Sequence, residues 1–347
     1  MKNILFRADG SKKIGMGHLN RASIICRKLL SNKINATLLM KNDVDGKSFL
    51  KRKGIKIQTL PDFNTIDDEV EFLSNYIVKT KPGIFFLDVL NQIDYSCLLK
   101  ICNNNHVVSV VIMDGSERMK DLNANIILNG NPNQLEYNYD SFSARCLTGA
   151  NYFIMDQDYS LIENTKPNGE IKNILVTLGG SDHNNLLFKV LKAIDNICKN
   201  VVIYVITTKA SGYIDELYST IDSMENFTNI YVDVDSLSKY WHKCDIAVTA
   251  GGNTLLERIS TRTPGATICQ LERQMEISDC FMKLGVNYNV GLGTKLTPDV
   301  IENSLKIFFN DIKSHKQQYL KAKNVIKGDG LLRLMDELHK TSMFLNQ

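Results

Sequence analysis

The sequence predicts an α/β protein built from two Rossmann-like domains that face each other across a cleft. Short, continuously apolar segments alternate with segments of helical spacing, which is typical of parallel sheets covered on both faces. Residues 163–172 interrupt this alternation with a polar segment that contains Pro167 and Gly169, as expected of a linker. Each half opens with a strand, a glycine-rich loop and a helix. Ligands are therefore expected beyond the carboxyl ends of the strands.

In the first half, the continuously apolar runs predict strands and the spaced apolar residues predict helices. The runs at 84–88 and 107–113 are notable because Asp88 closes the first and Asp114 follows the second. Helices are expected over about 19–29, 67–79 and 93–102. The expected strands are residues 3–7, 36–40, 55–60, 84–88, 107–113 and 124–128, the last being the final strand of this half.

In the second half the same alternation restarts after the linker. A helix is expected from about Asn184, and residues 298–345 are expected to be helical with a break at Gly328-Asp329-Gly330. The expected domains are 1–162 and 173–347, with the last helices packing back on the first domain. The expected strands are residues 174–178, 201–207, 230–234, 246–249 and 266–271.

Length and charge narrow the function classes. The 347 residues are enough for two domains of about 150 residues each. The net charge is +3, from 41 basic and 38 acidic residues. This is too small to indicate a basic nucleic-acid-binding surface, so no nucleic-acid partner is expected. No apolar run approaches the ~20 residues of a membrane helix, so no membrane span is expected. The apolar stretch near the N-terminus is too short for a signal peptide.

The cysteines and histidines give no metal pattern. The eight cysteines form no CxxC pair, which argues against zinc-ribbon and thioredoxin-like sites, and a reduced, cytoplasmic compartment is expected. No cluster has convincing metal-ligand spacing, so neither a metal nor a cofactor is expected. Apart from His18, the histidines are isolated, although His183 adjoins a glycine loop.

The first candidate site is the strand–loop–helix at the start of the chain. It runs Arg7-Ala8-Asp9-Gly10 and then Gly15-Met16-Gly17-His18-Leu19-Asn20-Arg21. The glycines let backbone approach a ligand, and the helix N-terminus favours anions. His18 lies at that N-terminus, where the helix dipole disfavours imidazolium, so a neutral ring is expected that could act as a general base. Alternatively, the motif is a tight turn that His18 caps.

A dinucleotide-binding loop is a weaker alternative for the same segment. Asp43 lies near the end of the second strand and could take the place of the ribose-binding acid. However, Asn20 stands where the third glycine of Gly-x-Gly-x-x-Gly is expected, and His18 intervenes. NAD binding is therefore less expected.

Two further glycine loops follow strands of the second half, and both could bind a diphosphate through backbone N–H groups. The first is Gly179-Gly180-Ser181-Asp182. The second is Gly251-Gly252-Asn253-Thr254, with Glu257 one turn later on the helix. A carboxylate there could accept two ribose hydroxyls, or it could be an exposed helix glutamate paired with a cation.

Asp88 and Asp114 end neighbouring strands of the first half. At these positions they could bind sugar hydroxyls, orient His18, or simply cap the strand ends. These alternatives are not separated by the sequence pattern alone.

Together these motifs resemble the nucleotide-sugar hydrolases of pseudaminic acid biosynthesis and related spore-coat polysaccharide proteins. Those proteins share the two-domain glycosyltransferase-B fold with the lipid II-forming N-acetylglucosaminyltransferase. The resemblance covers most of the chain and rests on Phe6–Asp9, Ile14–His18, Val176–Asp182 and Ala250–Glu257.

The resemblance implies hydrolysis of a UDP-linked 2,4-diacetamido-2,4,6-trideoxy sugar, in nonulosonic acid or surface polysaccharide biosynthesis. It implies that His18 activates water and that the second domain holds the nucleotide, with Glu257 on the ribose and the glycine loops on the diphosphate. The predicted substrate-binding residues are Arg7, Asp9, Gly15, Gly17, Arg21, Asp88 and Asp114.

The chain departs from the family pattern where the sugar is expected to bind. Asp88-Val89-Leu90-Asn91 stands in place of Asp-His-Tyr-Gly, and Asp114-Gly115 in place of Asp-Asp. Tyr152–Asp156 replaces a usual Tyr-Ala-Leu-Leu-Arg. A glycosyltransferase using a UDP-sugar donor and a catalytically silent nucleotide-sugar binding protein therefore remain as alternatives.

Overall fold

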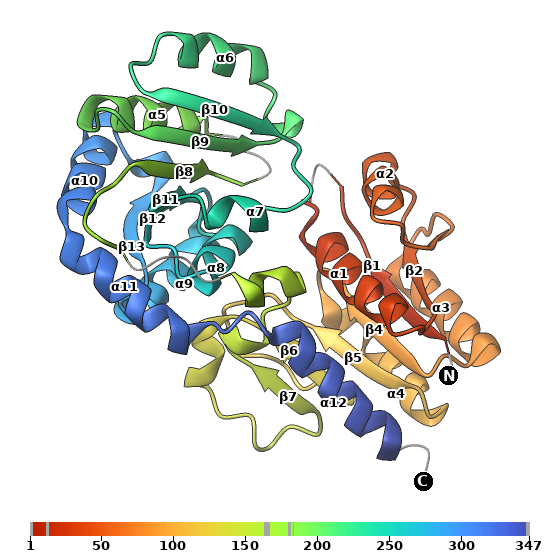
Figure 1. The fold of residues 1–347 in the computed structure, drawn as a ribbon. Coiled ribbons are helices and arrows are strands. Elements are labelled where there is room, and N and C mark those ends of the chain that lie inside the picture. The colour runs from red at the N-terminus through yellow and green to blue at the C-terminus, as the bar shows by residue number, and fades with distance from the viewer. Residues whose placement is uncertain (1–2, 12–13, 163–166, 180–181, 183, 345–347) are drawn as a thin grey trace. The chain divides into compact units, whose positions relative to one another are not determined.

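The computed structural model divides the chain into two compact units (Figure 1). It describes residues 3–11, 14–162, 167–179, 182 and 184–344. The first unit combines Met1–Asp156 with Asp329–Gln347, and the second is Gln157–Gly328. Residues 163–166 of the predicted linker lie outside the described residues, and the predicted domain limits stay a prediction.

The described part of the first unit contains a seven-stranded sheet in the order β3-β2-β1-β4-β5-β6-β7, in which neighbouring strands are parallel. The central strands are buried along their whole length because both faces of the sheet are covered. The strands are β1 (Ile4–Ala8), β2 (Ala36–Met40), β3 (Ile57–Thr59), β4 (Ile84–Asp88), β5 (Val108–Ile112), β6 (Ile126–Asn129) and β7 (Arg145–Thr148).

Helices pack on both faces of this sheet (Figure 1). One core contains residues of α1 and α12, and the other contains residues of α3 and α4. The rings of Phe6 and Phe86 stack in the first core with centroids 4.3 Å apart. The helices are α1 (Gly17–Ser31), α2 (Val44–Arg52), α3 (Ile66–Thr80), α4 (Ser96–Asn104) and α12 (Gly330–Phe344), with short 3-10 turns η1 (Gln92–Tyr95), η2 (Pro132–Glu136) and η3 (Ala150–Tyr152).

The second unit repeats this architecture, with six strands among its described residues in the order β10-β9-β8-β11-β12-β13, again parallel. The strands are β8 (Asn173–Thr177), β9 (Val202–Thr207), β10 (Phe227–Val232), β11 (Ile246–Thr249), β12 (Gly265–Cys269) and β13 (Tyr288–Leu292). The helices are α5 (Leu186–Ile197), α6 (Ile214–Asp222), α7 (Ser238–Trp241), α8 (Asn253–Ser260), α9 (Glu272–Lys283), α10 (Pro298–Asn310) and α11 (Ile312–Val325), with 3-10 turns η4 (Gln157–Leu161), η5 (Lys209–Ser211) and η6 (Gly293–Lys295).

Each sheet has one point where the strand order reverses. In the first unit, β1 lies between β2 and β4, and in the second unit β8 lies between β9 and β11. The chain runs outward from β1 to β3 and then returns to β4, and it does the same from β8 to β10 and β11. Ligands of open α/β sheets bind at the carboxyl ends of the strands at such a reversal. The carboxyl ends of the strands at these two reversals therefore position the candidate site residues.

The two parallel-sheet units confirm the predicted fold class, but two edge strands were not predicted. The prediction that 124–128 is the last strand of the first half was wrong, because β7 (Arg145–Thr148) pairs with β6. In the second unit β13 pairs with β12 through an irregular register between Thr267 and Ile268. Both strands are short or polar (Arg-Cys-Leu-Thr and Tyr-Asn-Val-Gly-Leu) and are half covered, so they lack the apolar run that marks a buried strand. No helix among the described residues is long and apolar enough to span a membrane.

The stacked pair in the first core makes a stability prediction. Phe86 has no exposed surface, so Phe86→Ala removes a packed ring and leaves a cavity. We expect a loss of about 3–5 kcal/mol in the free energy of unfolding, measured by urea denaturation. Val78→Ala, at a position that is 45% exposed, serves as the control and should change stability by less than about 0.5 kcal/mol. Equal stability of the two variants would contradict the buried stack.

Candidate active site

The first group of candidate residues lies at the strand-order reversal of the first unit. Ala8, the last residue of β1, pairs with Asp88, the last residue of β4. The chain then turns through Gly15, whose φ of +84° lies in the left-handed region that glycine tolerates. Helix α1 begins at Gly17, so that His18 is in its first turn. The imidazole of His18 therefore lies at the carboxyl end of β4.

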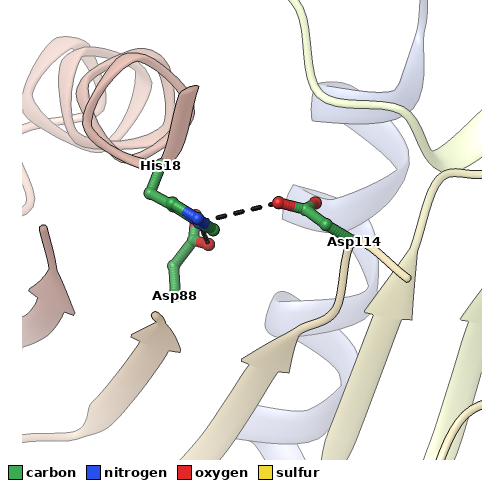
Figure 2. A group of neighbouring side chains, drawn as sticks. All are labelled: His18, Asp88 and Asp114. Carbon is green, nitrogen blue, oxygen red and sulfur yellow. Dashed lines mark hydrogen bonds and ion pairs between the residues drawn. The ribbon is translucent and has the colours of Figure 1, made fainter. Parts of the chain in front are cut away.

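His18 and Asp88 form a short hydrogen bond (Figure 2). The distance from Nδ1 of His18 to Oδ1 of Asp88 is 2.6 Å, and the Asp88 side chain is only 1% exposed. A carboxylate only accepts, so the bonded nitrogen carries the proton. This tautomer leaves the lone pair on Nε2, which has no hydrogen-bond partner among the described residues. The arrangement is the one expected if Asp88 orients His18.

Arg21 connects Asp88 with Asp114. It follows His18 by one turn of α1, so both side chains lie on the same face. Its Nε donates to Oδ2 of Asp88 at 2.8 Å, and its Nη2 donates to Oδ1 at 2.6 Å. The same guanidinium donates to both oxygens of Asp114, from Nη2 at 2.9 Å and from Nη1. Bidentate pairing of this kind fixes the orientation of a carboxylate as well as its charge.

The pKa of His18 is higher than its usual value, so the direction of shift expected from the helix dipole was wrong. Burial lowers the pKa, but the hydrogen bond to Asp88, together with the negative charges of Asp88 and Asp114, outweighs burial and the opposing charge of Arg21. The helix dipole at the start of α1, on which the expectation rested, is the weaker influence beside a bonded carboxylate. For Asp88 itself, burial favours the neutral acid, yet Arg21 and His18 hold the pKa of the carboxyl below its usual range.

The same three side chains, His18, Asp88 and Asp114, could in principle hold a metal ion, since one ligand atom from each lies within 4.8 Å of the others. However, the guanidinium of Arg21 already pairs with both carboxylates. A cation would have to displace a fixed positive charge, so the donor set does not fit a metal. The expected absence of a metal stays a prediction.

Arg7 and Asp9, both predicted to bind substrate, lie in a buried network next to this site. Arg7 has no exposed surface and donates to Asp9 and to Glu69 of α3, each at 2.7 Å. Tyr95 also donates to Glu69, at 2.9 Å. Asp9 accepts from the backbone N–H of Lys41 at 2.8 Å. We therefore expect Arg7 to support the loop after β1 rather than to touch a ligand.

Sequence reasoning missed Glu69 and Tyr95 in this network. Glu69 lies 62 positions from Arg7, on an acidic helix start that also contains Asp67 and Asp68. Nothing in the local pattern distinguishes a buried glutamate from the exposed acids around it.

The second group of candidate residues lies at the reversal of the second unit. Thr177 of β8 and Thr249 of β11 are paired, and the N–H of Ala250 donates to the carbonyl of Thr177 at 3.1 Å. The loops that begin at Gly179 and Gly251 therefore start side by side. Gly179 has a φ of +89°, a conformation that favours glycine. Gly180, Ser181 and His183 lie outside the described residues.

Gly251 and the start of α8 form the better described loop. A Cβ on Gly251 would lie 2.8 Å from Sγ of Cys269, so only glycine fits there. Gly252 precedes α8, and neither a side-chain cap nor an acidic residue occupies the first turn, which contains Asn253 and Thr254. The first N–H groups of such a helix favour an anion. Glu257 follows on the next turn, half-buried, and accepts from the hydroxyl of Tyr159 at 2.9 Å.

Asp182, predicted to bind nucleotide, is almost fully buried and holds the start of α5. Its two oxygens accept from the N–H groups of Leu186 and Leu187, from Gln270 and from Tyr213. The carboxylate therefore caps α5. No sequence pattern identified Gln270 and Tyr213 as partners of Asp182. Gln270 follows β12 and Tyr213 precedes α6, so both are distant from Asp182 in the sequence.

These two parallel sheets, each with a reversal of strand order, define the class of the protein: an α/β protein with the two-domain glycosyltransferase-B fold. MurG of Acinetobacter baumannii is similar to the chain with a TM-score of 0.72 and 13% identity, over 98% of this chain and 100% of that one. Glycosyltransferase VinC, in a complex with dTDP, is similar with a TM-score of 0.63 and 12% identity, over 98% and 99% of the two chains. At these identities the likeness shows the fold alone.

Among curated proteins the chain is similar to three of particular interest. It is 25% identical to an uncharacterized protein of Methanocaldococcus jannaschii, over 79% of this chain and 57% of that protein. It is 22% identical to the spore coat polysaccharide biosynthesis protein SpsG of Bacillus subtilis, over 94% and 95%. It is 20% identical to the UDP-2,4-diacetamido-2,4,6-trideoxy-beta-L-altropyranose hydrolase of Campylobacter jejuni, over 81% and 97%. No family model matches the chain. The latter two relatives support the resemblance drawn from the motifs.

The bond between His18 and Asp88 predicts a pH effect. In Asp88→Asn the negative charge that raises the pKa of His18 is lost, while the opposing charge of Arg21 remains. The pKa of His18 should therefore fall, as measured by NMR titration of its ring protons. Asp94→Asn, which removes the same charge at an exposed position of η1, is the control and should leave the His18 titration unchanged. An unchanged pKa in Asp88→Asn would refute the assigned pairing.

Proposed function

We propose that the chain is a nucleotide-sugar hydrolase that releases UDP and a free sugar of the 2,4-diacetamido-2,4,6-trideoxy type, for nonulosonic acid or surface polysaccharide biosynthesis. The observation that carries the proposal is the 2.6 Å bond between His18 and Asp88, which supports a role of Nε2 as the base because it keeps the ring proton on Nδ1. The name of the Campylobacter jejuni relative and the motifs shared with that family support the substrate class.

In this mechanism the first unit activates water. Nε2 of His18 accepts a proton from a water molecule as the water oxygen attacks the anomeric carbon. Asp88 keeps the proton on Nδ1 and stabilises the imidazolium that forms. The bond from the anomeric carbon to the phosphate oxygen breaks, and UDP leaves with the bonding electrons. Arg21 and Asp114 hold Asp88 in the required orientation.

The second unit stabilises the leaving group. The negative charge that develops on the diphosphate is met by backbone N–H groups of the two glycine loops and of the α8 N-terminus. Thr254 adds a hydroxyl, and Glu257 accepts from the ribose. This part of the mechanism uses fixed dipoles of the chain.

A glycosyltransferase is the second candidate, because similar solved structures with this fold include enzymes of that kind. The same base would then take a proton from an acceptor hydroxyl in place of water. A binding protein without turnover is the third candidate, since Val89-Leu90-Asn91 departs from the family pattern after Asp88. Incubation with a panel of UDP- and CMP-sugars, followed by NMR, separates the three. Free sugar formed without an acceptor supports hydrolysis, and bound but unchanged UDP-sugar supports a binding protein.

With the substrate found in this panel, His18→Ala tests the base directly. Loss of the imidazole should lower kcat by about 10²–10⁴-fold, a typical contribution of general base catalysis. His242→Ala replaces an exposed histidine of the second unit and should keep full activity. Turnover of His18→Ala near the unaltered rate would remove His18 from the mechanism.

The pairing of Arg21 predicts independence from divalent metals. Because its guanidinium satisfies Asp88 and Asp114, dialysis against EDTA should leave turnover unchanged. Addition of Mg²⁺ or Mn²⁺ should not raise it. Loss of turnover on chelation, restored by either ion, would show that a metal displaces Arg21 during catalysis.

A further inference from the structure

The hydroxyl of Tyr159 donates a hydrogen bond to the carboxylate of Glu257. Tyr159 belongs to none of the sequence motifs. We propose that Tyr159 is a positioning residue for Glu257, and that this pair makes the nucleotide site select ribose over 2′-deoxyribose. The inference rests on the proposed function, because it assigns Glu257 to the ribose of a bound UDP. It adds a residue from outside every motif that pointed to the nucleotide site.

The contact has an ordinary hydrogen-bond length, and the tyrosine is buried. The Tyr159 hydroxyl donates to Oε2 of Glu257 at 2.9 Å, and Tyr159 is only 3% exposed. Tyr159 lies in η4, 98 positions before Glu257, which is on the second turn of α8. A buried phenol that donates to a carboxylate is a charge-assisted hydrogen bond, which is stronger than a neutral one.

The phenol keeps its proton and therefore remains a donor. Burial, together with the charge of Glu257, raises the pKa of Tyr159 far above its usual value. Polar contacts with Trp241 and Ser236 act in the opposite direction on this pKa and do not offset the burial. The hydroxyl thus lies among three polar side chains of the second unit, which fixes its direction.

The backbone that carries Tyr159 is itself held in place. Gly328 lies against this segment, and a Cβ built on it would be 3.2 Å from Cα of Ser160. Its φ of +72° is in the left-handed region, so glycine is favoured there for both reasons. The close approach of Gly328 leaves η4 little freedom, and the phenol therefore presents its hydroxyl at a fixed point.

A fixed carboxylate discriminates between riboses better than a mobile one. A free glutamate side chain loses rotamer freedom when it binds, and Tyr159 removes part of that cost in advance. A carboxylate has about four acceptor positions, so a bond from Tyr159 is compatible with further bonds from ribose hydroxyls. A site built to bond a hydroxyl rejects the analogue that lacks it, because the acceptor is then left unsatisfied.

The test compares the binding of UDP and 2′-deoxy-UDP to the full chain by calorimetry. The unaltered chain should bind UDP about tenfold or more tightly than 2′-deoxy-UDP, the effect of one hydrogen bond to a charged group. In Tyr159→Phe, the ratio of the two dissociation constants should fall to within about threefold of unity, mainly through weaker UDP binding. If Tyr159 acts in folding alone, Tyr159→Phe should weaken the binding of both ligands equally and leave the ratio of dissociation constants unchanged.

Two further variants keep the test decisive. Tyr76→Phe, which removes a hydroxyl bonded to Gln58 at 2.7 Å in the first unit, is the matched control and should keep the full ratio. Glu257→Asp retains the charge but moves the carboxylate away from Tyr159. In this variant too, the ratio of the two dissociation constants should fall towards unity. Adding Tyr159→Phe to Glu257→Asp should then cause little further loss. If Tyr159→Phe does not fold, Glu257→Asp carries the comparison.

The outcomes separate this inference from the proposed function. UDP binding with an unchanged ratio in Tyr159→Phe overturns the inference and leaves the hydrolase proposal standing. An unaltered chain that binds UDP and 2′-deoxy-UDP equally also overturns the inference alone. An unaltered chain that binds neither nucleotide overturns both.

Discussion

The buried carboxylate of Asp88 is the constraint on which the first site depends. It ends a strand that is covered on both faces, and its side chain is only 1% exposed. A charge taken out of water is stable only when it is paired and hydrogen-bonded. His18 and Arg21 satisfy both oxygens from successive turns of α1. The same contacts that stabilise the strand end therefore also orient the imidazole of His18.

The second unit uses a buried carboxylate differently. Asp182 is also almost fully buried, but its partners are backbone N–H groups of α5, an amide and a phenol. Burial raises the pKa of the Tyr213 phenol, so that it keeps its proton. This carboxylate therefore holds the start of α5 and has no partner that is a base near neutral pH. The two units thus share a topology and a reversal of strand order, yet their loops differ in chemistry. One presents a titratable ring, and the other presents backbone N–H groups and glycines.

Much of this could be predicted from the sequence because the signals are local. Continuous apolar runs marked the buried strands, and glycines after those runs marked the loops at which His18 and Gly251 lie. The edge strands β7 and β13 were missed because half-covered strands need no apolar run. Glu69 and Tyr159 were missed for a different reason. Glu69 lies 62 positions from its partner Arg7, and Tyr159 lies 98 positions from its partner Glu257. Such contacts are set by tertiary packing and leave no periodic pattern.

The charges of the first site account for the raised pKa of His18. Asp88 and Asp114 carry two negative charges, and Arg21 supplies one positive charge, so the group around a neutral His18 is left with an excess negative charge. A proton taken up by Nε2 cancels that excess, which is why the pKa of His18 is raised although the ring is buried. The second carboxylate, Asp114, therefore contributes to basicity without bonding to the ring as closely as Asp88 does, at 3.6 Å compared with 2.6 Å. The exposed Asp114 sets the charge of the group and the buried Asp88 sets its geometry. A base that starts from this charge state forms its conjugate acid at a smaller electrostatic cost than an isolated histidine at the same burial.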